Sequence, residues 1–84
     1  MDEEEISLQE LRKILVRSHA ATEGPWRSFI DGRDQFSGDD FIQTAGNDIH
    51  LSGATQSDQD FIASARQDVD RLAIMVAKLK GWDL

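Results

Sequence analysis

Between residues 55 and 81, apolar residues recur every three or four positions, which is the spacing of one face of an α-helix. Thr55 and Asp58 match a capping box at its start, and Gly81 is typical of a helix end. The pattern predicts one uninterrupted helix whose apolar face packs on the rest of the chain. That face consists of Ile62, Ala65, Val69, Leu72, Val76 and Leu79, and is widened by Phe61, Ala73 and Met75.

A shorter amphipathic stretch follows residues 1–5, an acidic tail that we expect to be frayed. Ser7 and Glu10 form a second capping box, which predicts a helix from there to about residue 20 or 21. Gly24-Pro25 follows and cannot extend a helix. The buried side of this helix is expected to carry Leu8, Leu11, Ile14 and Leu15.

The middle of the chain has strand and turn character. Residues 26–30 are rich in β-forming side chains that alternate in part, and residues 41–45 and 48–52 resemble the arms of a hairpin joined across Gly46-Asn47. Residues 31–40 consist of turn-forming residues and predict a mobile loop. The order of elements predicts an α+β fold in a single domain over residues 1–84. Its three-stranded antiparallel sheet would carry the short N-terminal helix and the long C-terminal helix on one face.

Composition limits the choice of function classes. The chain has 84 residues, no cysteine, and sixteen acidic against nine basic residues, for a net charge of −7. Disulfides and thiolate metal sites are therefore excluded. Without a signal-like start or a long apolar run, we expect a soluble, cytoplasmic protein with no membrane contact. So small a core predicts modest stability, which a second copy covering part of the long helix would improve.

The acidic residues are concentrated in one segment. Residues 31–60 contain seven acidic residues and one base, Arg33. This charge disfavours direct contact with nucleic acid, because phosphate binding requires clustered Lys and Arg. It suits a basic protein partner, and the alternative is a solvated surface that keeps a small protein in solution.

Candidate metal ligands crowd the loop, where Asp31, Asp34, Asp39 and Asp40 offer oxygen atoms that hard cations prefer. Their spacing does not match the calcium-loop pattern, which favours an ordinary loop over a metal site. His19 and His50 are the only histidines. Neither stands in an arrangement typical of a catalytic base, so we expect no enzyme and no cofactor.

Two stretches carry a resemblance. Residues 19–26, His-Ala-Ala-Thr-Glu-Gly-Pro-Trp, and residues 60–72, which include Phe-Ile-Ala-Ser-Ala-Arg-Gln-Asp-Val, resemble segments of small phage and prophage proteins of the Ead-like kind. The chain departs from that pattern at Asp70, where those proteins often carry proline, so its helix is expected to continue. The resemblance implies a mobile-element or bacterial accessory protein and implies no catalytic residue.

The leading hypothesis is a small non-catalytic binding module, in its sharpest form an immunity or inhibitor protein that covers a basic site on a toxin or nuclease. A nucleic-acid mimic that blocks a DNA-binding protein is a close variant. The alternative is a structural homo-oligomer of phage origin, with a homodimer formed through the C-terminal helix. The long helix keeps heptad-like spacing for too short a distance to predict a coiled coil. The predicted partner-binding residues are Asp31, Asp34, Asp39, Asp40 and Asp48 on the acidic segment, and Met75, Leu79 and Trp82 in an apolar patch near the C-terminus.

Overall fold

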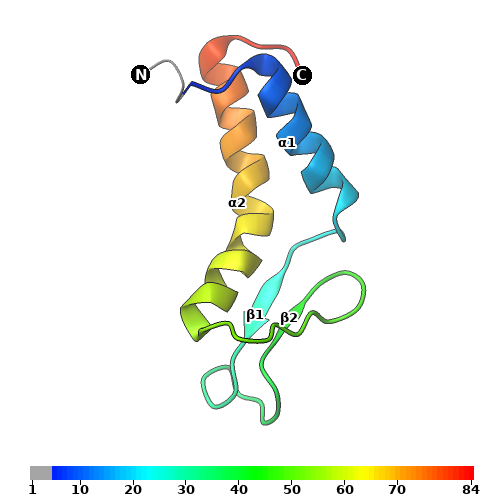
Figure 1. Cartoon of the computed structure of the whole chain (residues 1–84), viewed down its shortest axis with the longest axis vertical. Helices are drawn as coiled ribbons and strands as arrows, with labels where there is room; N and C mark the ends of the chain where they lie inside the picture. The colour runs from blue at the N-terminus through cyan, green and yellow to red at the C-terminus, as the bar shows by residue number, and fades with distance from the viewer. Residues whose placement is uncertain (1–4) are drawn as a thin grey trace.

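The computed structural model describes residues 5–84, so the tail predicted over residues 1–5 lies almost entirely outside the described residues. Two helices and two strands follow one another as α1 (Leu8–Ala20), β1 (Arg27–Phe29), β2 (Phe41–Gln43) and α2 (Gln56–Lys80) (Figure 1). The predicted α+β class is confirmed. The molecule is elongated, with extents of 47 × 28 × 19 Å, because α1 and the sheet lie along opposite halves of α2 (Figure 1).

Both helices start and end close to where the sequence predicts. Ser7 accepts a hydrogen bond from the Glu10 amide while the Glu10 carboxylate accepts one from the Ser7 amide, and Thr55 and Asp58 repeat this arrangement at α2. Gly81 ends α2 with a left-handed backbone at φ 69°. Over its 25 residues α2 is continuous.

The sheet has two strands, so the predicted third strand is wrong. β1 and β2 are antiparallel, with Ser28 opposite Ile42. Residues 48–52 contribute only an isolated bridge between Ile49 and Ile42. The Thr44 hydroxyl accepts a hydrogen bond from the Gly46 amide and donates one to the Asn47 carbonyl, so the expected turn is present. On one side of this turn, however, the Ala45 amide donates to the Glu23 carbonyl, and on the other side Ile49 exchanges backbone hydrogen bonds with Ile42 alone.

The placement of both helices on one face of the sheet is also wrong. In the described part of the chain α2 packs against β1, β2 and α1, whereas α1 packs against α2 alone. Two strands of three residues each offer too little surface for a second helix, so α1 uses the other half of α2. The inward side of α1 is as predicted, since Leu11 is buried and Leu8, Ile14 and Leu15 are half-buried.

The inner side of α2 is the largest correction. Its fully buried residues are Gln59, Ala63, Ala73 and Ala77, not the larger apolar residues of the predicted stripe. Val76 and Ala65 are half-buried, but Leu72 and Leu79 remain 65% and 80% exposed. The backbone of β1 and the side of α1 approach α2 closely. Small side chains and hydrogen-bonding amides fit there, and branched apolar ones do not.

Gln59 joins both strands to the helix. Its side chain is 3% exposed, and its Nε2 lies 2.9 Å from Ser28 Oγ, 3.2 Å from the Phe29 carbonyl and 3.0 Å from the Phe41 carbonyl. The amide nitrogen donates to this group of oxygens, which come from β1 and β2. The contact satisfies polar atoms that α2 would otherwise cover.

Gln67 repeats the arrangement two turns later. The Trp26 amide donates to Gln67 Oε1 at 2.6 Å, and Gln67 Nε2 donates to the Trp26 carbonyl at 3.3 Å. Ala63 lies between the two glutamines on the same side of α2 and is 2% exposed. The chain entering the sheet is therefore held against α2 by side-chain amides.

The apolar core is small. Leu11, Ala73 and Ala77 form one buried cluster between the helices, against which Leu15, Val76 and Trp82 pack. The largest fully buried side chains of the described residues are Leu11, Ile30 and Ile42. On the outer face of the sheet, Phe29 and Phe41 stack at 5.0 Å between ring centroids, and Phe36 meets both edge-on. Within residues 5–84, neither helix combines the length and apolar character needed to cross a membrane.

Replacing Gln59 by leucine tests the role of its amide. Leucine keeps most of the volume but leaves buried strand oxygens without their donor, so the free energy of unfolding should fall by about 2 kcal/mol. Chemical denaturation followed by circular dichroism measures this value. Gln56→Leu, at an exposed position of the same helix, is the control and should change stability far less. Equal effects of the two variants would contradict the role of Gln59.

Candidate functional site

Arg33 connects the 31–40 loop to the start of α2. Its guanidinium lies 2.8 Å and 3.0 Å from the two carboxylate oxygens of Asp60, and 2.9 Å from Asp34 Oδ2. Hydrogen bonds from Arg33 lower the pKa of both Asp34 and Asp60, and these carboxylates in turn raise the pKa of Arg33. One of the predicted partner-binding residues, Asp34, is thus engaged inside the molecule.

Two more predicted carboxylates hold the loop in shape. Asp40 Oδ1 accepts a hydrogen bond from the Asp31 amide at 2.8 Å, and Asp31 Oδ1 accepts one from the Gly38 amide at 3.4 Å. Asp39 and Asp48 take part in none of these contacts and are exposed. Of the five acidic residues predicted to bind a partner, only these two therefore have carboxylates outside the contacts that hold the loop. The mobility of the loop stays a prediction.

The acidic residues do not gather into a metal site in the structure. Among residues 5–84, no three His, Asp or Glu side chains lie close enough together to hold a metal ion. His50 Nδ1 lies 3.2 Å from the Asp40 carbonyl, and both histidines are exposed.

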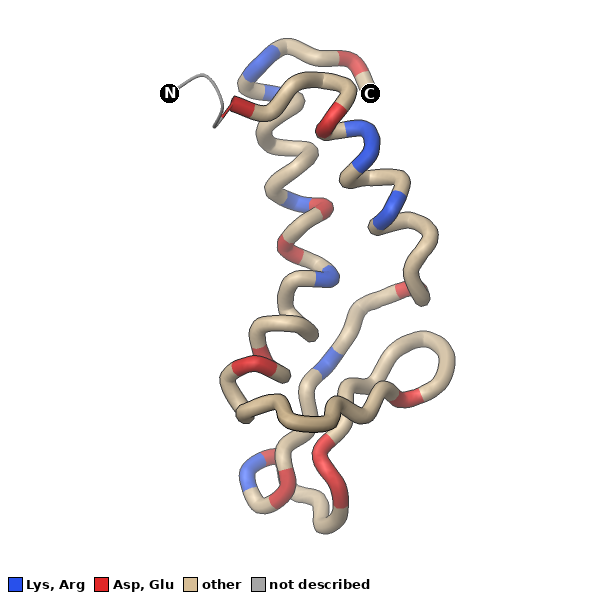
Figure 2. The backbone as a smooth tube through the Cα atoms, viewed as in Figure 1, with Lys and Arg blue, Asp and Glu red and all other residues tan. Residues whose placement is uncertain are grey.

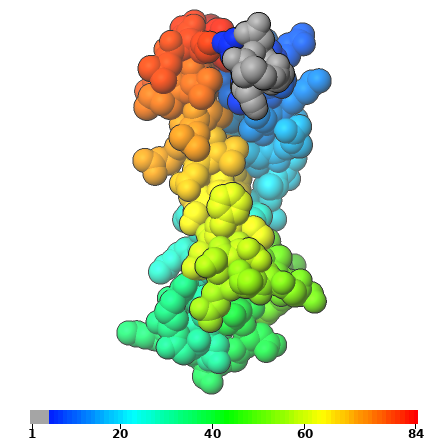
Figure 3. Space-filling view, turned by 60° about the vertical axis from the view of Figure 1, so that its left-hand side comes forward, coloured from blue at the N-terminus to red at the C-terminus, as the bar shows by residue number. Residues whose placement is uncertain are grey.

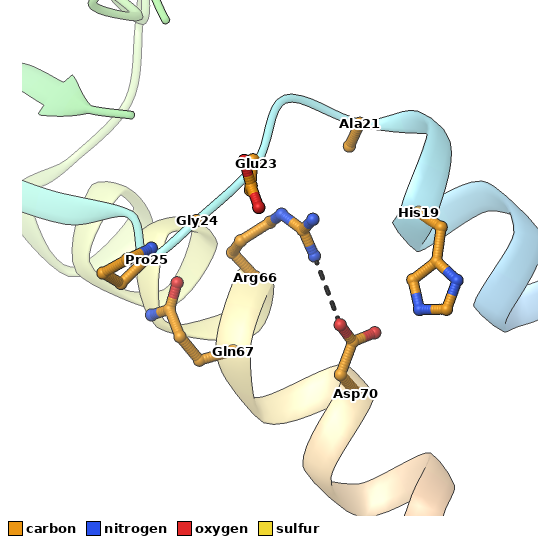
Figure 4. A pocket seen from close by; sticks show the side chains of 8 residues that line it. All are labelled: His19, Ala21, Glu23, Gly24, Pro25, Arg66, Gln67 and Asp70. Carbon is orange, nitrogen blue, oxygen red and sulfur yellow. Dashed lines mark ion pairs between the residues drawn. The ribbon is translucent and has the colours of Figure 1, made fainter. Parts of the chain in front are cut away.

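A hollow of about 720 Å³ lies where the chain leaves α1 and passes α2 (Figure 4). Arg66 reaches into it from α2, donating through Nε to the Thr22 carbonyl at 3.0 Å and through Nη1 to Ser18 Oγ at 2.8 Å. Asp70 lies 3.6 Å from the same guanidinium and accepts a hydrogen bond from Ser18. The lining residues are His19, Ala21, Glu23, Gly24, Pro25, Arg66, Gln67 and Asp70.

These polar groups serve the junction itself. The Arg66 side chain is only 11% exposed, and its donors point at the end of α1 and the segment that follows it. Gln67 is engaged by the backbone of Trp26. The hollow is therefore the place where α1 is held against α2, and the side chains of Arg66, Gln67 and Asp70 are already engaged there.

The side of α2 that faces away from α1 and the sheet carries the exposed apolar residues. Phe61 is 74% exposed, Leu72 65%, Met75 51% and Leu79 80%. Figure 3 looks onto this side, where side chains of α2 form the surface and α1 lies beside them. The outer face of α2 is defined by Phe61, Leu72, Met75 and Leu79, together with Ile62 and Val69 at its edge. These two residues are each 37% exposed and line a hollow on the side of α1, with Ile14, Arg17, Ser18 and Trp26. The other exposed large apolar residues of the described chain are Ile6, Val16, Ile74 and Leu84.

The structure separates the predicted C-terminal patch. Met75 and Leu79 lie on the outer face of α2, but Trp82 is half-buried against the Leu11–Ala73–Ala77 cluster. Phe61 and Leu72 belong to the exposed face, although the sequence pattern placed them on the buried side. A signal was present in the stripe Gln59–Ala63–Arg66–Asp70–Ala73–Ala77, which keeps helical spacing on the opposite side of α2.

Replacing Arg33 by glutamine tests the ion pairs that Arg33 forms with Asp34 and Asp60, through the pH dependence of their contribution to stability. Hydrogen bonds from Arg33 hold the pKa values of Asp34 and Asp60 in the folded protein below their values in the unfolded chain, which are about 4. The contribution of these hydrogen bonds to the free energy of unfolding is therefore present above that pH and is lost as the pH falls through the folded-state pKa values. The melting temperature of Arg33→Gln should therefore lie below that of the wild type at pH 7. The difference should shrink below about pH 4.

Thermal denaturation between pH 3 and 7 measures this difference. Arg27→Gln removes the same charge from a base whose guanidinium lies over the Phe29 ring at 5.3 Å, and serves as the control. Its effect should change much less with pH. A pH profile shared by both variants would show that Arg33 acts only through net charge.

Comparison with known proteins adds no family to this geometry. No family model matches the chain, no curated protein is significantly similar to it, and no solved structure matches it significantly. The resemblance to Ead-like phage proteins therefore rests on its two stretches of sequence and stays a prediction.

Proposed function

We propose that this chain is a non-catalytic protein-binding module whose contact surface is the outer face of α2. The observation that carries the proposal is the exposure of four large apolar side chains, Phe61, Leu72, Met75 and Leu79, on one side of one helix. Removing apolar surface from water lowers the free energy, so covering this face with a complementary protein surface is favourable.

The size of the face supports a binding role. The exposed fractions of its six residues correspond to roughly 500–600 Å² of surface, which is at the upper end of what soluble monomers leave uncovered. Phe61 and Leu79 stand near its two ends and Leu72 near its middle. Aromatic and aliphatic anchors in this arrangement are typical of helix-mediated recognition.

The face is also held rigid from behind. On the opposite side of α2, Gln59 and Gln67 fix the sheet, and Arg66 and Asp70 fix the end of α1. A capping box and a glycine cap complete the helix. A partner would therefore meet a preformed surface and would not have to order the helix on binding.

Leu72→Glu tests this surface. The change places a charge in the middle of the outer face and should weaken partner binding by roughly 100-fold, because the charge would be desolvated in the complex. Retention by the immobilised chain is measured, both for proteins of the native cell extract and for a tagged second copy of the chain. Val16→Glu, at an exposed position of α1, is the matched control and should retain partners normally.

The two variants separate the possible results. A protein that is lost with Leu72→Glu and kept with Val16→Glu contacts the outer face. If every retained protein binds both variants equally, the outer face is not the contact surface.

A second candidate function uses the acidic end of the molecule. Figure 2 shows acidic residues concentrated around the sheet and its loops, whereas Lys and Arg alternate with acidic residues over the opposite half. Such a polarised surface favours capture of a basic protein, as an immunity protein or inhibitor would capture a toxin, a nuclease or a DNA-binding protein. Asp39 and Asp48 are the carboxylates best placed for this role.

The double variant Asp39→Asn, Asp48→Asn tests the acidic end without disturbing the loop contacts. It should weaken retention of basic proteins several-fold at low salt, and the difference should fade at about 1 M salt, where the Debye length is about 3 Å. Glu5→Gln with Asp83→Asn removes the same charge from the other end and is the control. Equal loss in both double variants would indicate net charge alone.

A further inference from the structure

We infer that the occupant of the outer face of α2 is the same face of a second copy, packed antiparallel about a two-fold axis near residue 70. The inference rests on the proposed function and names its partner. Three features of the described residues carry it: the spacing of the seam, the position of one charged residue within it, and the distribution of charge along the molecule.

The seam has the spacing of a two-stranded coil. Positions 61, 65, 68, 72, 75 and 79 are separated alternately by four and three residues. They span about 27 Å of an unbroken helix, at about 1.5 Å per residue. Ile62, Val69 and Val76 border one edge of this seam, whereas Ser64, Arg71 and Lys78 border the other. A second helix with the same seam matches it in length and chemistry.

Antiparallel packing gives every seam residue a partner at the same level of the other copy. With the axis near residue 70, Phe61 faces the partner's Leu79, which pairs two large side chains, and Ala65 faces the partner's Met75, which pairs a small one with a large one. Bulky layers near the ends of the seam are then separated by a smaller layer, which permits close packing of the two helices. The contact is isologous, as a two-fold dimer requires.

Asp68 decides the orientation. In a parallel dimer it would face the partner's Asp68 inside an apolar seam, which places two like charges together with loss of water. In the antiparallel dimer it faces the partner's Leu72 and lies beside the partner's Arg71, and the two Arg71 residues also meet near the axis, each next to the other copy's Asp68. The two-fold axis then creates this ion pair twice. A surface hollow of about 430 Å³ lined by Asp68, Arg71, Leu72 and Met75 lies at this centre.

Charge along the molecule favours the same orientation. The sheet end carries mainly acidic residues, whereas acidic and basic residues are mixed in the opposite half (Figure 2). Antiparallel packing brings each acidic sheet end beside the mixed half of the other copy, whereas parallel packing would place the two acidic ends together. The bases of the opposite half are Arg12, Lys13, Arg17, Arg71, Lys78 and Lys80. Its acids include Glu5, Glu10, Asp68, Asp70 and Asp83, and the sequence places Asp2, Glu3 and Glu4 before Glu5.

The area predicts a dimer of moderate affinity. Roughly 500–600 Å² of apolar surface per copy, with the stems of Arg71 and Lys78 added, approaches the ~800 Å² per partner of a standard interface. Dissociation constants in the micromolar range are expected for such a contact. Self-association should therefore depend on concentration within the range that sedimentation covers.

Sedimentation equilibrium of the full chain tests the dimer. The wild type should pass from monomer to dimer between about 1 μM and 1 mM, and Leu72→Glu should raise the dissociation constant by at least about 100-fold. Val16→Glu should leave the constant within about threefold of the wild type, because single exposed positions outside an interface contribute little. A strictly monomeric wild type at 1 mM, taken as about the upper limit of the assay, would overturn the inference.

Cross-linking tests the orientation. Because the sequence contains no cysteine, an introduced cysteine is the only thiol that can react in each variant. Ser64→Cys and Lys78→Cys place thiols on one edge of the seam, at exposed positions. In the antiparallel dimer residue 64 faces the partner's residue 78. A short bifunctional thiol reagent should therefore join the two variants when they are mixed and join neither to itself. Cross-linking of each variant to itself would indicate parallel packing and would overturn the orientation.

The result for the dimer can be separated from that for the proposed function. A monomeric chain that still retains another protein in a Leu72-dependent manner excludes the second copy and keeps the outer face as a binding surface. A monomeric chain whose retained proteins ignore Leu72→Glu contradicts both proposals.

Discussion

The side-chain amide of Gln59 is the contact on which the arrangement of this molecule depends. It donates into a group of oxygens that belong to β1 and β2, so one residue of α2 fixes both strands. A buried amide with several acceptors is directional, unlike an apolar contact. It therefore sets both the distance and the orientation of the sheet relative to the helix. Gln67 and Arg66 extend this polar attachment to the segment that precedes β1.

The polar attachment explains why α2 presents apolar residues to water. Backbone atoms lie against its inner side, so that side accepts alanine and hydrogen-bonding residues and has little space for leucine or phenylalanine. The larger apolar residues consequently occupy the outer face. A small core and an uncovered face are two results of one constraint. Association would bury the apolar residues that the fold of a single chain leaves exposed, and binding of this kind stabilises the folded state. The stability of the chain is therefore linked to its proposed function.

The candidate sites were predictable to different degrees. The acidic segment was evident from the sequence, but the internal tasks of Asp31, Asp34 and Asp40 depend on where the loop folds back. Met75 and Leu79, which the pattern placed both on the packed stripe and in an exposed patch near the C-terminus, are exposed, whereas Trp82 turns back onto the core because Gly81 reverses the chain. Phe61 and Leu72 were assigned to the wrong side. An amphipathic pattern shows that a helix has an apolar face but does not show what covers it.

The sequence by itself determined the features that local hydrogen bonds control. Capping boxes at Ser7 and Thr55 and the glycine at position 81 set the helix ends, because their partners lie within a few residues. The α+β class and the inward side of α1 followed from periodicity. Only the tertiary structure decided that the third strand shrinks to one bridge and that α2 turns its glutamines and alanines inward. These outcomes depend on backbone atoms about thirty residues away in sequence, whose close approach selects small and hydrogen-bonding side chains over larger apolar ones.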